Sequence, residues 1–435
     1  MPSSHPDLPG QSAWPAGAPE QFATDVVWRL QAAGFVAYWA GGCVRDRLMQ
    51  RPPKDFDVAT NATPEQVRSV FGRRNTQAVG AAFGVILVYG PVRGLQVEVA
   101  TFRQDLGYSD GRHPDAVQFT SPALDAQRRD FTINGIFYDP SRDAVIDYVG
   151  GEQDIRNKVV RAIGEPQRRF AEDKLRMLRA VRFAAVLKFE LDAATSAAIA
   201  DDAESINVVS GERIGDEMRK MLCDSQRARA VELLYETRLL HVLLPTVATL
   251  ANSSPPAWQR TLARLESLVE PSFAQALAAL LLDDPRAIVA SEHVRSTIEW
   301  VRYHWKLAND ESDGATWLIR HVNVIQRAKE VKWPELQRLM IQPGRDELLG
   351  LADAMVRANQ FDAIGLEFCR QVVGQDESVW NPPPLINGND LQELNIPRGP
   401  IYRSLLEQVR DRQLLGQIAT RDDALQWVAR SYHDS

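Results

Sequence analysis

The chain has 435 residues, of which 45% are hydrophobic and 25% are charged, and its formal net charge is −7. A chain of this length exceeds one ordinary hydrophobic core, so we expect two to four domains. The composition is typical of a soluble globular protein, and no stretch approaches about 18 uninterrupted apolar residues, which argues against a membrane span. The acidic balance excludes a grossly basic protein but is compatible with a local basic surface.

The N-terminal segment and the cysteines exclude further classes. Residues 1–20 hold five prolines and no Lys or Arg, which predicts a disordered arm and argues against a secretory signal or a basic transit peptide. The cysteines, Cys43, Cys223 and Cys369, are odd in number and far apart. They predict neither a disulfide framework nor a Cys-x-x-Cys metal site, and they fit a reducing cytoplasm.

Short apolar runs punctuated by Gly and Asp occupy residues 21–150. Helical spacing of apolar residues predicts two helices here, over 19–34 and 63–72. Shorter apolar runs predict strands within five segments: 35–42, 55–60, 83–90, 95–102 and 144–150. We therefore expect residues 21–150 to form one domain that mixes helices and strands.

After about residue 151 the strand signals vanish and helical spacing takes over. It is clear in four segments, 168–187, 194–206, 211–223 and 227–244, and continues toward the end of the chain. Proline clusters at 254–256 and 382–384 predict joints between helices. We expect an all-helical second part that divides into 151–225, 226–345 and 346–435.

Three acidic residues of the first domain form a candidate metal site. Asp55 and Asp57 are separated by one aromatic residue, and residues two apart on a strand point to the same face. Glu98 lies between two valines that are expected in the core. Three carboxylates on adjacent strands can hold two Mg²⁺ ions roughly 3.5–4 Å apart, and oxygen ligands suit Mg²⁺ better than zinc. Taken singly, the Asp-x-Asp pair is more typical of a turn and Glu98 could be an exposed strand residue, but their joint order favours a metal.

A glycine pair stands shortly before the two aspartates. The Gly41–Gly42 turn would let main-chain N–H groups approach a polyphosphate, and Arg45 would supply positive charge. The alternative is an ordinary turn. The chain has neither G-x-x-x-x-G-K-[ST] nor G-x-G-x-x-G, which excludes a Walker A loop and a Rossmann site.

The ordered motifs closely resemble those of class II nucleotidyltransferases, the family of bacterial-type tRNA CCA-adding enzymes and poly(A) polymerases. The motifs are "GGCVRDRLM", "KDFDVAT", "VEVATFR", "RRDFTINGIFYD", "GEPQRRFAEDKLRMLRAVRF" and "GERIGDEMRKML". The resemblance is dense over about 36–225 and weaker in "PPLINGNDLQELNIPRGPIYRSLLEQV". It implies an α+β fold in which a nucleotidyltransferase head, with a small mixed β-sheet and helices, precedes an all-α neck (151–225), body (226–345) and tail (346–435).

The motif at 128–139 carries a second group of candidate residues. Arg128 and Arg129 could clamp phosphates, while Asp130 and Asn134 could hydrogen-bond a ribose hydroxyl. Asp130 could equally open a helix as its N-cap, and the two roles can coexist. By resemblance, this motif selects ribonucleotides over deoxyribonucleotides.

The motif at 164–183 is the most basic part of the chain. Residues 161–182 carry six Arg and one Lys against three acids. On one helix, Glu172, Asp173 and Arg176 would share a face, and Arg179 and Arg182 would extend it. The alternative is a solvated helix with salt bridges; beside the acidic cluster we favour a nucleotide site. The resemblance implies that Asp173 and Arg176 bind the edge of the incoming base in place of a template.

The resemblance implies addition of CCA to tRNA 3′ ends from CTP and ATP, with release of pyrophosphate and Mg²⁺ on Asp55, Asp57 and Glu98. The helical tail would contact the tRNA. Poly(A) synthesis, or addition of only CC or only A, is an alternative within the family. A catalytically inactive RNA-binding protein is an alternative of another class. The polar segment 103–118 is either a gating loop or simply a mobile one. The oligomeric state is left open.

Overall fold

The computed structural model describes residues 18–80, 84–107, 116–287, 289 and 296–433. Most of the expected N-terminal arm and the centre of segment 103–118 lie outside the described residues. The chain divides into two compact units, one of Met1–Met221 with Arg229–Leu243 and one of Leu222–Ala228 with Leu244–Ser435. In the described parts of the chain, no helix is both long and apolar enough to cross a membrane. The finer division into head, neck, body and tail stays a prediction.

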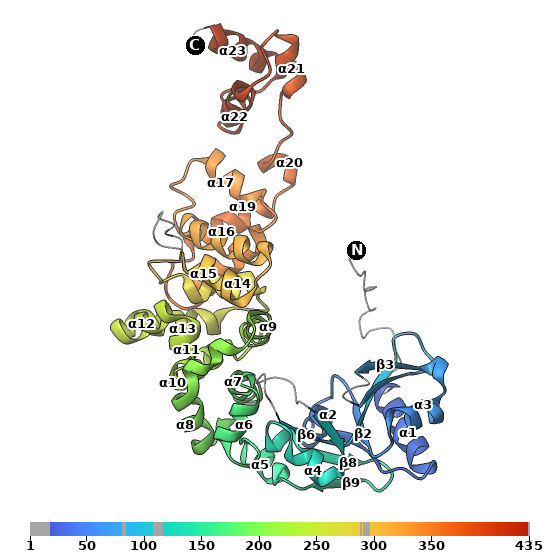
Figure 1. Ribbon diagram of the computed structural model, residues 1–435. Coiled ribbons are helices and arrows are strands. Elements are labelled where there is room, and N and C mark those ends of the chain that lie inside the picture. Colours follow the sequence, from blue (N-terminus) through green and yellow to red (C-terminus); the bar gives the residue numbers. More distant parts are fainter. Residues whose placement is uncertain (1–17, 81–83, 108–115, 288, 290–295, 434–435) are drawn as a thin grey trace. The chain divides into compact units, whose positions relative to one another are not determined.

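Seven strands of the described residues form one mixed sheet in the first unit (Figure 1), in the order β3-β4-β5-β2-β1-β8-β9. The pair β2–β5 is parallel and the other neighbouring pairs are antiparallel. The sequence predicted five of these strands, and the mixed sheet confirms the expected head. The strands are β1 (Ala37–Ala40), β2 (Asp57–Thr60), β3 (Thr76–Gly80), β4 (Val85–Tyr89), β5 (Gln96–Thr101), β8 (Ile136–Asp139) and β9 (Ala144–Asp147).

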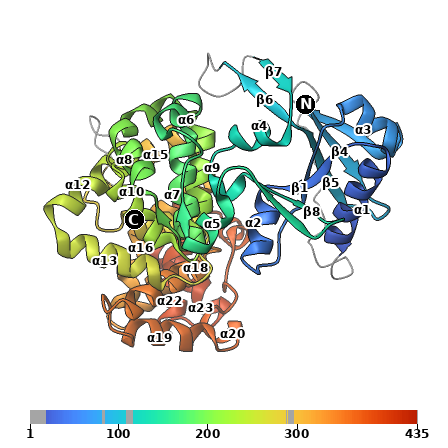
Figure 2. The ribbon, with the colours of Figure 1, turned by 90° about the horizontal axis from the view of Figure 1, so that it is seen from below.

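Two predicted helices, α1 (Ala18–Ala32) and α3 (Pro64–Phe71), pack against strands of this sheet (Figure 2). The apolar face of α1 is buried through Val26, Val27 and Leu30 among others. Helix α3 begins at a capping box made by Thr63 and Gln66, which satisfies main-chain N–H groups that would otherwise lack a partner. The shorter helices of the head are α2 (Gly42–Leu48), α4 (Pro122–Gln127), α5 (Gly151–Asn157), η2 (Arg73–Asn75) and η4 (Thr132–Asn134).

Two small pairs of strands lie outside the main sheet. The segment that we expected to be a loop, 103–118, instead contains β6 (Arg103–Leu106) and β7 (Ala116–Phe119), which pair antiparallel. The expectation that strands end after residue 151 was also wrong, because β10 (Val159–Val160) pairs parallel with β11 (Glu190–Leu191). Strands β10 and β11 have two residues each, which is too short for a periodic signal. Strand β6 is mostly polar, so its sequence does not show the apolar run that predicts a strand.

The helices that follow the head in the first unit include the basic segment 161–182. The predicted helix over 168–187 is in fact two helices, because the chain is extended at Asp173, with φ −151° and ψ 106°. The helices are α6 (Pro166–Glu172), α7 (Leu175–Leu187), α8 (Ala193–Asp202), η5 (Ala203–Val208), α9 (Gly211–Leu222), α10 (Arg227–Glu236) and α11 (Leu239–Leu243).

The described residues of the second unit are helical. Every residue of α14 is buried, so this helix forms the centre of its bundle. The last three helices share a separate apolar cluster that includes Leu391, Val409 and Val428. The prolines of 254–256 begin α13 and those of 382–384 lie between α20 and α21, so both clusters mark boundaries between helices, as predicted. The helices are α12 (Pro245–Ser253), α13 (Pro255–Ser267), α14 (Phe273–Leu281), α15 (Thr297–Trp305), α16 (Asn309–Gln326), α17 (Trp333–Met340), α18 (Arg345–Arg357), α19 (Ile364–Val373), α20 (Glu377–Trp380), α21 (Gly388–Glu393), α22 (Pro400–Leu414) and α23 (Arg421–His433).

Candidate active site

The acidic residues of the head lie on one face of the sheet. Asp57 begins β2 and is the direct register partner of Glu98 on the neighbouring parallel strand β5. Both side chains are exposed, as is Asp55, whereas Phe56 is buried and packs on Trp39 with ring centroids 5.0 Å apart. Strand geometry therefore turns Asp57 and Glu98 away from the core, and Asp55, which precedes β2, is exposed as well.

Electrostatic repulsion within this group is visible at Asp57. Desolvation and the Glu98 and Asp55 carboxylates together raise the pKa of Asp57 to about 6, although the guanidinium of Arg129 acts to lower it. A divalent cation would remove this repulsion, so the donor set fits Mg²⁺. Among the described residues, no three His, Cys, Asp or Glu side chains are grouped closely enough to hold a metal as they stand. Binding would therefore require the carboxylates to rotate toward one another.

The glycine pair makes a tight turn between β1 and α2. Gly41 has φ +74°, a backbone conformation that favours glycine. A Cβ at this position would stand 3.2 Å from Nη1 of Arg129. The N–H of Gly41 donates to the main-chain oxygen of Ile136 (3.3 Å), while Gly42 begins α2. The glycine at position 41 therefore leaves room for Arg129, and its own N–H is already engaged within the sheet.

Asn134 is the hub of a buried hydrogen-bond chain. Nη1 of Arg45 donates to Oδ1 of Asn134 (2.8 Å), and Nδ2 of Asn134 donates to Oδ1 of Asp130 (3.1 Å). The other oxygen of Asp130 accepts from Nε of Arg179 on α7 (2.9 Å). Nη1 of Arg129 donates to the main-chain oxygen of Asn134 (3.3 Å). The chain of contacts thus joins the glycine turn to helix α7.

Asp130 does not open a helix, contrary to one of the two expected roles. Its Oδ1 accepts the N–H of Phe131 (2.8 Å), and the short helix that follows has Phe131 at its N-cap. Burial alone would raise the pKa of Asp130, but the charge of Arg179 and the hydrogen bonds lower it to about 2. Asp130 therefore pairs with the half-buried Arg179 and does not cap a helix, because the buried carboxylate would be costly without a counter-charge.

Arg128 and Arg129 are held by an acid that sequence reasoning missed. Nε of Arg128 donates to Oδ1 of Asp125 (2.9 Å), and Nε and Nη2 of Arg129 donate to its Oδ2 (3.2 and 3.1 Å). Burial would raise the pKa of Asp125, but the two guanidinium groups hold it below its ordinary value. The signal was present, since Asp125 precedes the arginines by three and four residues, the spacing of neighbours on a helix.

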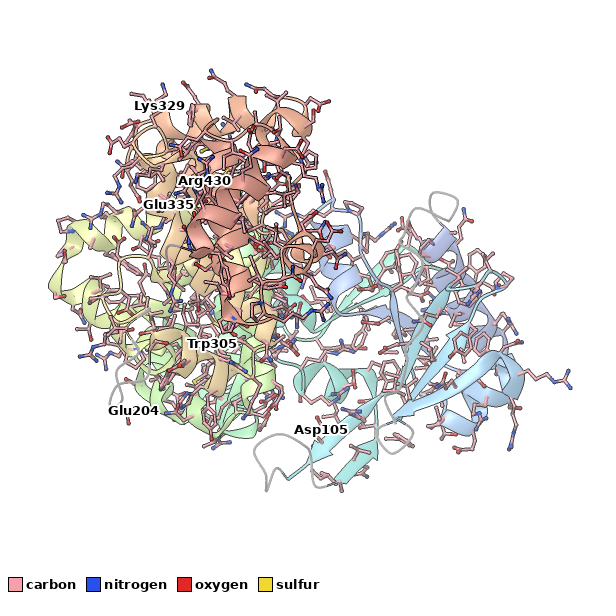
Figure 3. All side chains as sticks on the ribbon, turned by 90° about the horizontal axis from the view of Figure 1, so that it is seen from above. Asp105, Glu204, Trp305, Lys329, Glu335 and Arg430 are labelled. Atoms are coloured by element: carbon pink, nitrogen blue, oxygen red, sulfur yellow. The ribbon has the colours of Figure 1, made fainter. Side chains whose placement is uncertain are left out.

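The β6–β7 ribbon contacts the same acid. The N–H of Arg103 donates to Oδ1 of Asp125 (3.1 Å), and Nη1 of Arg128 lies 3.6 Å from Oδ2 of Asp105 (Figure 3). These contacts connect the base of the ribbon to the two arginines. Residues 108–115, which carried part of the predicted gating loop, lie outside the described residues.

The basic motif is not one helical face, and the expectation that Glu172, Asp173 and Arg176 share a helix is corrected. Glu172 ends α6, Asp173 lies in the extended link, and Arg176 is in the first turn of α7. Nη1 of Arg176 still reaches Glu172 (2.5 Å) and also donates to the main-chain oxygen of Arg169 (3.0 Å). The i,i+4 pair survives the break because the two helices remain in contact.

The carboxylate of Asp173 has two hydrogen-bonding partners, Arg213 on α9 and Leu175 at the start of α7. Its carboxylate accepts from both terminal nitrogens of Arg213 on α9, at 3.2 and 2.7 Å. Its Oδ1 also accepts the N–H of Leu175 (3.0 Å), which fixes it at the start of α7. Sequence reasoning named Asp173 but not Arg213, although the motif that contains it was recognised.

Two further arginines of α7 and Arg45 of α2 lie around the aromatic ring of Phe183. The guanidinium carbons of Arg182, Arg179 and Arg45 lie 4.2, 5.4 and 5.3 Å from the ring centroid of Phe183. Arg182 also pairs with Glu217 on α9 (2.5 Å). Sequence reasoning missed Phe183, which lies directly after Arg182 and holds three cations in place through its ring face.

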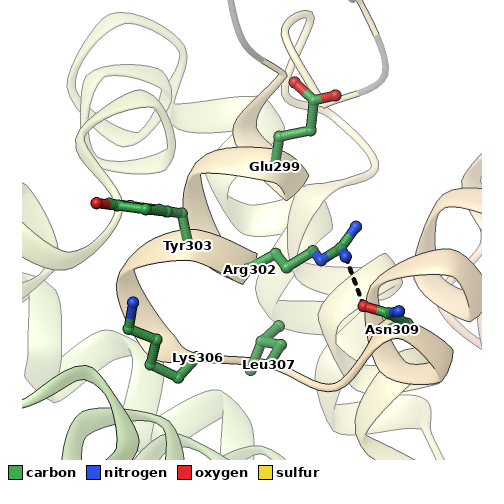
Figure 4. Close-up of a pocket in the computed structure, with 6 residues that line it drawn as sticks. All are labelled: Glu299, Arg302, Tyr303, Lys306, Leu307 and Asn309. Atoms are coloured by element: carbon green, nitrogen blue, oxygen red, sulfur yellow. Dashed lines mark hydrogen bonds between the residues drawn. The ribbon is translucent and has the colours of Figure 1, made fainter.

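A separate surface hollow lies in the second unit. It has a volume of about 630 Å³ and is lined by residues of α15 and the start of α16 (Figure 4). Arg302 donates to Asn309, and the ammonium of Lys306 lies 4.6 Å from the ring centroid of Tyr303. None of the residues singled out from the sequence lines this hollow, so it is not part of the candidate site.

Comparison with known proteins matches two segments of the chain to known domains. Residues 37–161 match the poly A polymerase head domain, and residues 188–250 match a domain described as the probable RNA and SrmB- binding site of polymerase A. Poly(A) polymerase I of Salmonella typhi is 41% identical over 240 residues, which are 52% of this chain and 50% of that protein. The CCA-adding enzyme of Geobacillus stearothermophilus is 42% identical over 231 residues, 53% of this chain and 56% of that protein.

The chain resembles CCA-adding enzymes and poly(A) polymerases, nucleotidyltransferases of one family, over the head domain and the segment that follows it. It spans about half the length of the curated relatives it matches. A solved structure of the Bacillus stearothermophilus CCA-adding enzyme in complex with CTP extends the likeness: it has a TM-score of 0.73 and 28% identity, and the match covers 96% of this chain and 98% of that chain. The Thermotoga maritima CCA-adding enzyme complexed with tRNA shares the fold, with a TM-score of 0.65 at 18% identity and coverage of 95% of both chains. Family members typically use a divalent metal.

Proposed function

We propose that the chain is a template-independent nucleotidyltransferase that adds CCA to tRNA 3′ ends. The hydroxyl oxygen of the RNA 3′ end attacks the α-phosphate of CTP or ATP, the new phosphodiester bond forms, and pyrophosphate leaves. The observation that carries the proposal is the likeness to a CTP-bound CCA-adding enzyme, which extends over nearly the whole of both chains. The sequence matches do not separate the two activities, since those to poly(A) polymerases and to CCA-adding enzymes each cover about half of the proteins.

The exposed carboxylates supply the site for chemistry. Asp55, Asp57 and Glu98 would hold Mg²⁺, which would activate the attacking hydroxyl and neutralise charge on the leaving pyrophosphate. Register pairing of Asp57 with Glu98 supports this assignment, and so does the pKa of Asp57, which is raised to about 6 by desolvation and neighbouring anions. The exposure of these side chains leaves them accessible to a triphosphate and an RNA end.

The buried polar chain of the head would orient the nucleotide. Arg129 lies beside the Gly41 turn and lowers the pKa of Asp57, so its charge acts on the carboxylate face. Asp130 and Asn134 would contact the ribose, with Arg45 and Arg179 holding them in place. Because each of these polar groups already has a partner in the described structure, the site is largely preorganised for binding.

Asp173 and Arg176 would read the base. Cytosine and adenine both present an exocyclic amino donor beside a ring-nitrogen acceptor, whereas uracil and guanine reverse that pattern. An aspartate that accepts and an arginine that donates would therefore favour C and A. A good two-point contact is worth about 1–3 kcal/mol. Glu172, Arg179 and Arg182 would support this region through the ion pairs described above.

Two rival functions remain distinct from this proposal. Poly(A) synthesis, or addition of only CC or only A, is the alternative within the family, and the 41% identity to poly(A) polymerase I favours testing it. A catalytically inactive RNA-binding protein is the alternative of another class. Three exposed and mutually repelling carboxylates argue against a pure binder, because they would weaken contact with RNA phosphates.

One incubation separates these ideas. The protein is mixed with Mg²⁺, labelled CTP and ATP, and tRNA that lacks its terminal CCA. Ordered incorporation of C, C and A supports the proposal, and long A tracts identify a poly(A) polymerase. Incorporation of only two C residues or only one A identifies a partial enzyme. If no nucleotide is incorporated while tRNA still binds, the protein is a binder.

A further inference from the structure

The carboxylate of Asp173 is anchored by a second helix. Arg213 stands in the first turn of α9 and donates from Nη1 to Oδ1 (3.2 Å) and from Nη2 to Oδ2 (2.7 Å). Both side chains are largely buried, with 23% and 15% of their surfaces exposed. A guanidinium that meets a carboxylate with two parallel bonds fixes the rotation of the carboxylate as well as its position.

Arg213 is needed because Asp173 has little local support. Its backbone is extended between α6 and α7, and its main-chain oxygen accepts the N–H of Arg176 (3.1 Å), which holds the backbone but not the side chain. The N–H of Leu175 donates to Oδ1 at 3.0 Å, which secures only one oxygen. Without Arg213 the second oxygen would keep no contact among those described, and the side chain could rotate about this single bond.

The attachment of α9 to α7 does not depend on Arg213. Glu217, one helical turn further along α9, is buried and pairs with Arg182 of α7 (2.5 Å) and with Lys220 (3.1 Å). Arg213 and Glu217 are four residues apart and therefore lie on one face of α9. Loss of Arg213 would leave the Glu217 pair to hold the helix, so the two contacts have separable roles.

We infer that Arg213 is a specificity-determining positioning residue, which orients the carboxylate of Asp173 to accept the amino group of an incoming C or A. The inference rests on the proposed function, in which Asp173 reads the base. A carboxylate offers about four acceptor positions. The three bonds from Arg213 and Leu175 leave about one, which suits one amino donor. A base that presents a carbonyl oxygen there would meet a fixed negative charge.

The test compares nucleotide selectivity in three variants. Arg213→Ala removes the anchor, Arg213→Lys keeps the charge but only a single donor group, and Arg168→Ala removes an exposed arginine of α6 as the control, its side chain being 84% exposed. Single-addition kcat/KM is measured for CTP against UTP and for ATP against GTP, on tRNA ends that accept each nucleotide. Thermal unfolding of every variant is recorded alongside.

If Arg213 positions Asp173, its loss should change the ratio of kcat/KM between two nucleotides, and not only lower the rates of incorporation. Arg213→Ala should lower the preference for CTP over UTP, or for ATP over GTP, by about tenfold to a hundredfold. Arg213→Lys should recover part of the preference, and Arg168→Ala should leave it unchanged. An equal loss for all four nucleotides, or an unchanged preference, overturns the inference while leaving the proposed function intact.

Two further outcomes are decisive. If Arg213→Ala does not fold, Arg213→Lys carries the test, and a wild-type preference in that folded variant overturns the inference. If the wild-type protein incorporates no nucleotide, the proposed function fails and the inference falls with it. A wild type that makes only A tracts still permits the comparison of ATP with GTP, so the role of Arg213 is judged separately from CCA addition.

Discussion

Asp57 on β2 and Glu98 on β5 are direct register partners in a parallel strand pair, with both side chains on the exposed face of the sheet. The ladder between the strands fixes the main-chain positions of the two residues, so their side chains remain neighbours although each can still rotate. The mutual repulsion of the two anions is therefore built into the fold, and a bound cation is the most direct way to relieve it.

Removal of one carboxylate should separate chemistry from RNA binding. We expect Asp55→Ala to lower nucleotide incorporation by about a hundredfold to a thousandfold or more, because a group that stabilises transition-state charge is lost. The dissociation constant for tRNA should stay nearly unchanged. Glu65→Gln, at an exposed position of α3, is the control. Equal losses of incorporation and tRNA binding in Asp55→Ala would contradict a metal role.

Mg²⁺ should stabilise the folded protein without any nucleotide present. A ligand at a hundredfold its dissociation constant adds about 2.7 kcal/mol to the free energy of unfolding. Asp57→Asn should lose most of this gain, whereas Glu65→Gln should keep it. The measurement is urea unfolding with Mg²⁺ and with EDTA. The same gain in wild type and Asp57→Asn would show that Mg²⁺ acts elsewhere.

The buried pair of Asp130 and Arg179 should make stability depend on acid pH. Although burial acts to raise it, Arg179 lowers the pKa of Asp130 to about 2 in the folded state, below the ordinary value of 3.8. The stabilisation is therefore present above pH 4 and is lost as the pH falls toward 2. This pH-dependent part is about 2 kcal/mol.

Asp130→Asn should abolish that dependence. At pH 7 the variant should be less stable than wild type by about 1.5–3 kcal/mol, because the hydrogen bonds from Arg179 to an ionised carboxylate are lost. The difference should shrink by about 2 kcal/mol between pH 5 and pH 2. Denaturant unfolding across this range measures it. A difference that stays constant with pH would show that the pair is not ionised as described.

Gly41→Ala should be costlier than an alanine at another left-handed glycine. Strain at positive φ costs about 1–3 kcal/mol, and the new Cβ would also press on Arg129 at 3.2 Å. Gly150 has a similar φ of +78° and nothing within 4 Å of a Cβ. Its ψ is 19°, against −127° at Gly41, so Gly150→Ala is the control for positive φ alone.

The comparison uses urea unfolding and incorporation kinetics. Gly150→Ala should lose about 1 kcal/mol of stability with normal activity. Gly41→Ala should lose more stability, and its incorporation rate should fall because Arg129 and its bond to Asn134 are displaced. Equal effects of the two substitutions would mean that the space beside Arg129 is unimportant.

The strands of the head that carry the acids could be predicted from sequence, because buried and exposed residues alternate within a few neighbouring positions. Buried Val97 and Val99 bracket exposed Glu98, and the alternation across 55–57 has the same form. Strand β3 was missed because its residues 77–79 are all exposed, and β8 because its four residues are all buried and give no alternation. Register between strands distant in sequence could be inferred only from the family resemblance.

The break between α6 and α7 could not be predicted from periodicity. Neither Asp173 nor Lys174 is a helix-breaking residue, and apolar positions continue across the link at helical spacing. The break is stabilised by Arg213, which is forty residues away in the sequence. Tertiary contacts of this kind override local propensity. Asp125, in contrast, was within reach of local reasoning, because its spacing to Arg128 and Arg129 is helical.

The most direct test of the central claim is diffraction from crystals that contain CTP and Mn²⁺ as an anomalous scatterer in place of Mg²⁺. The account predicts an anomalous peak coordinated by Asp57, Glu98 and the triphosphate, and no such peak in Asp57→Asn crystals. A triphosphate bound with its phosphates away from these carboxylates, or a metal held elsewhere, would contradict it.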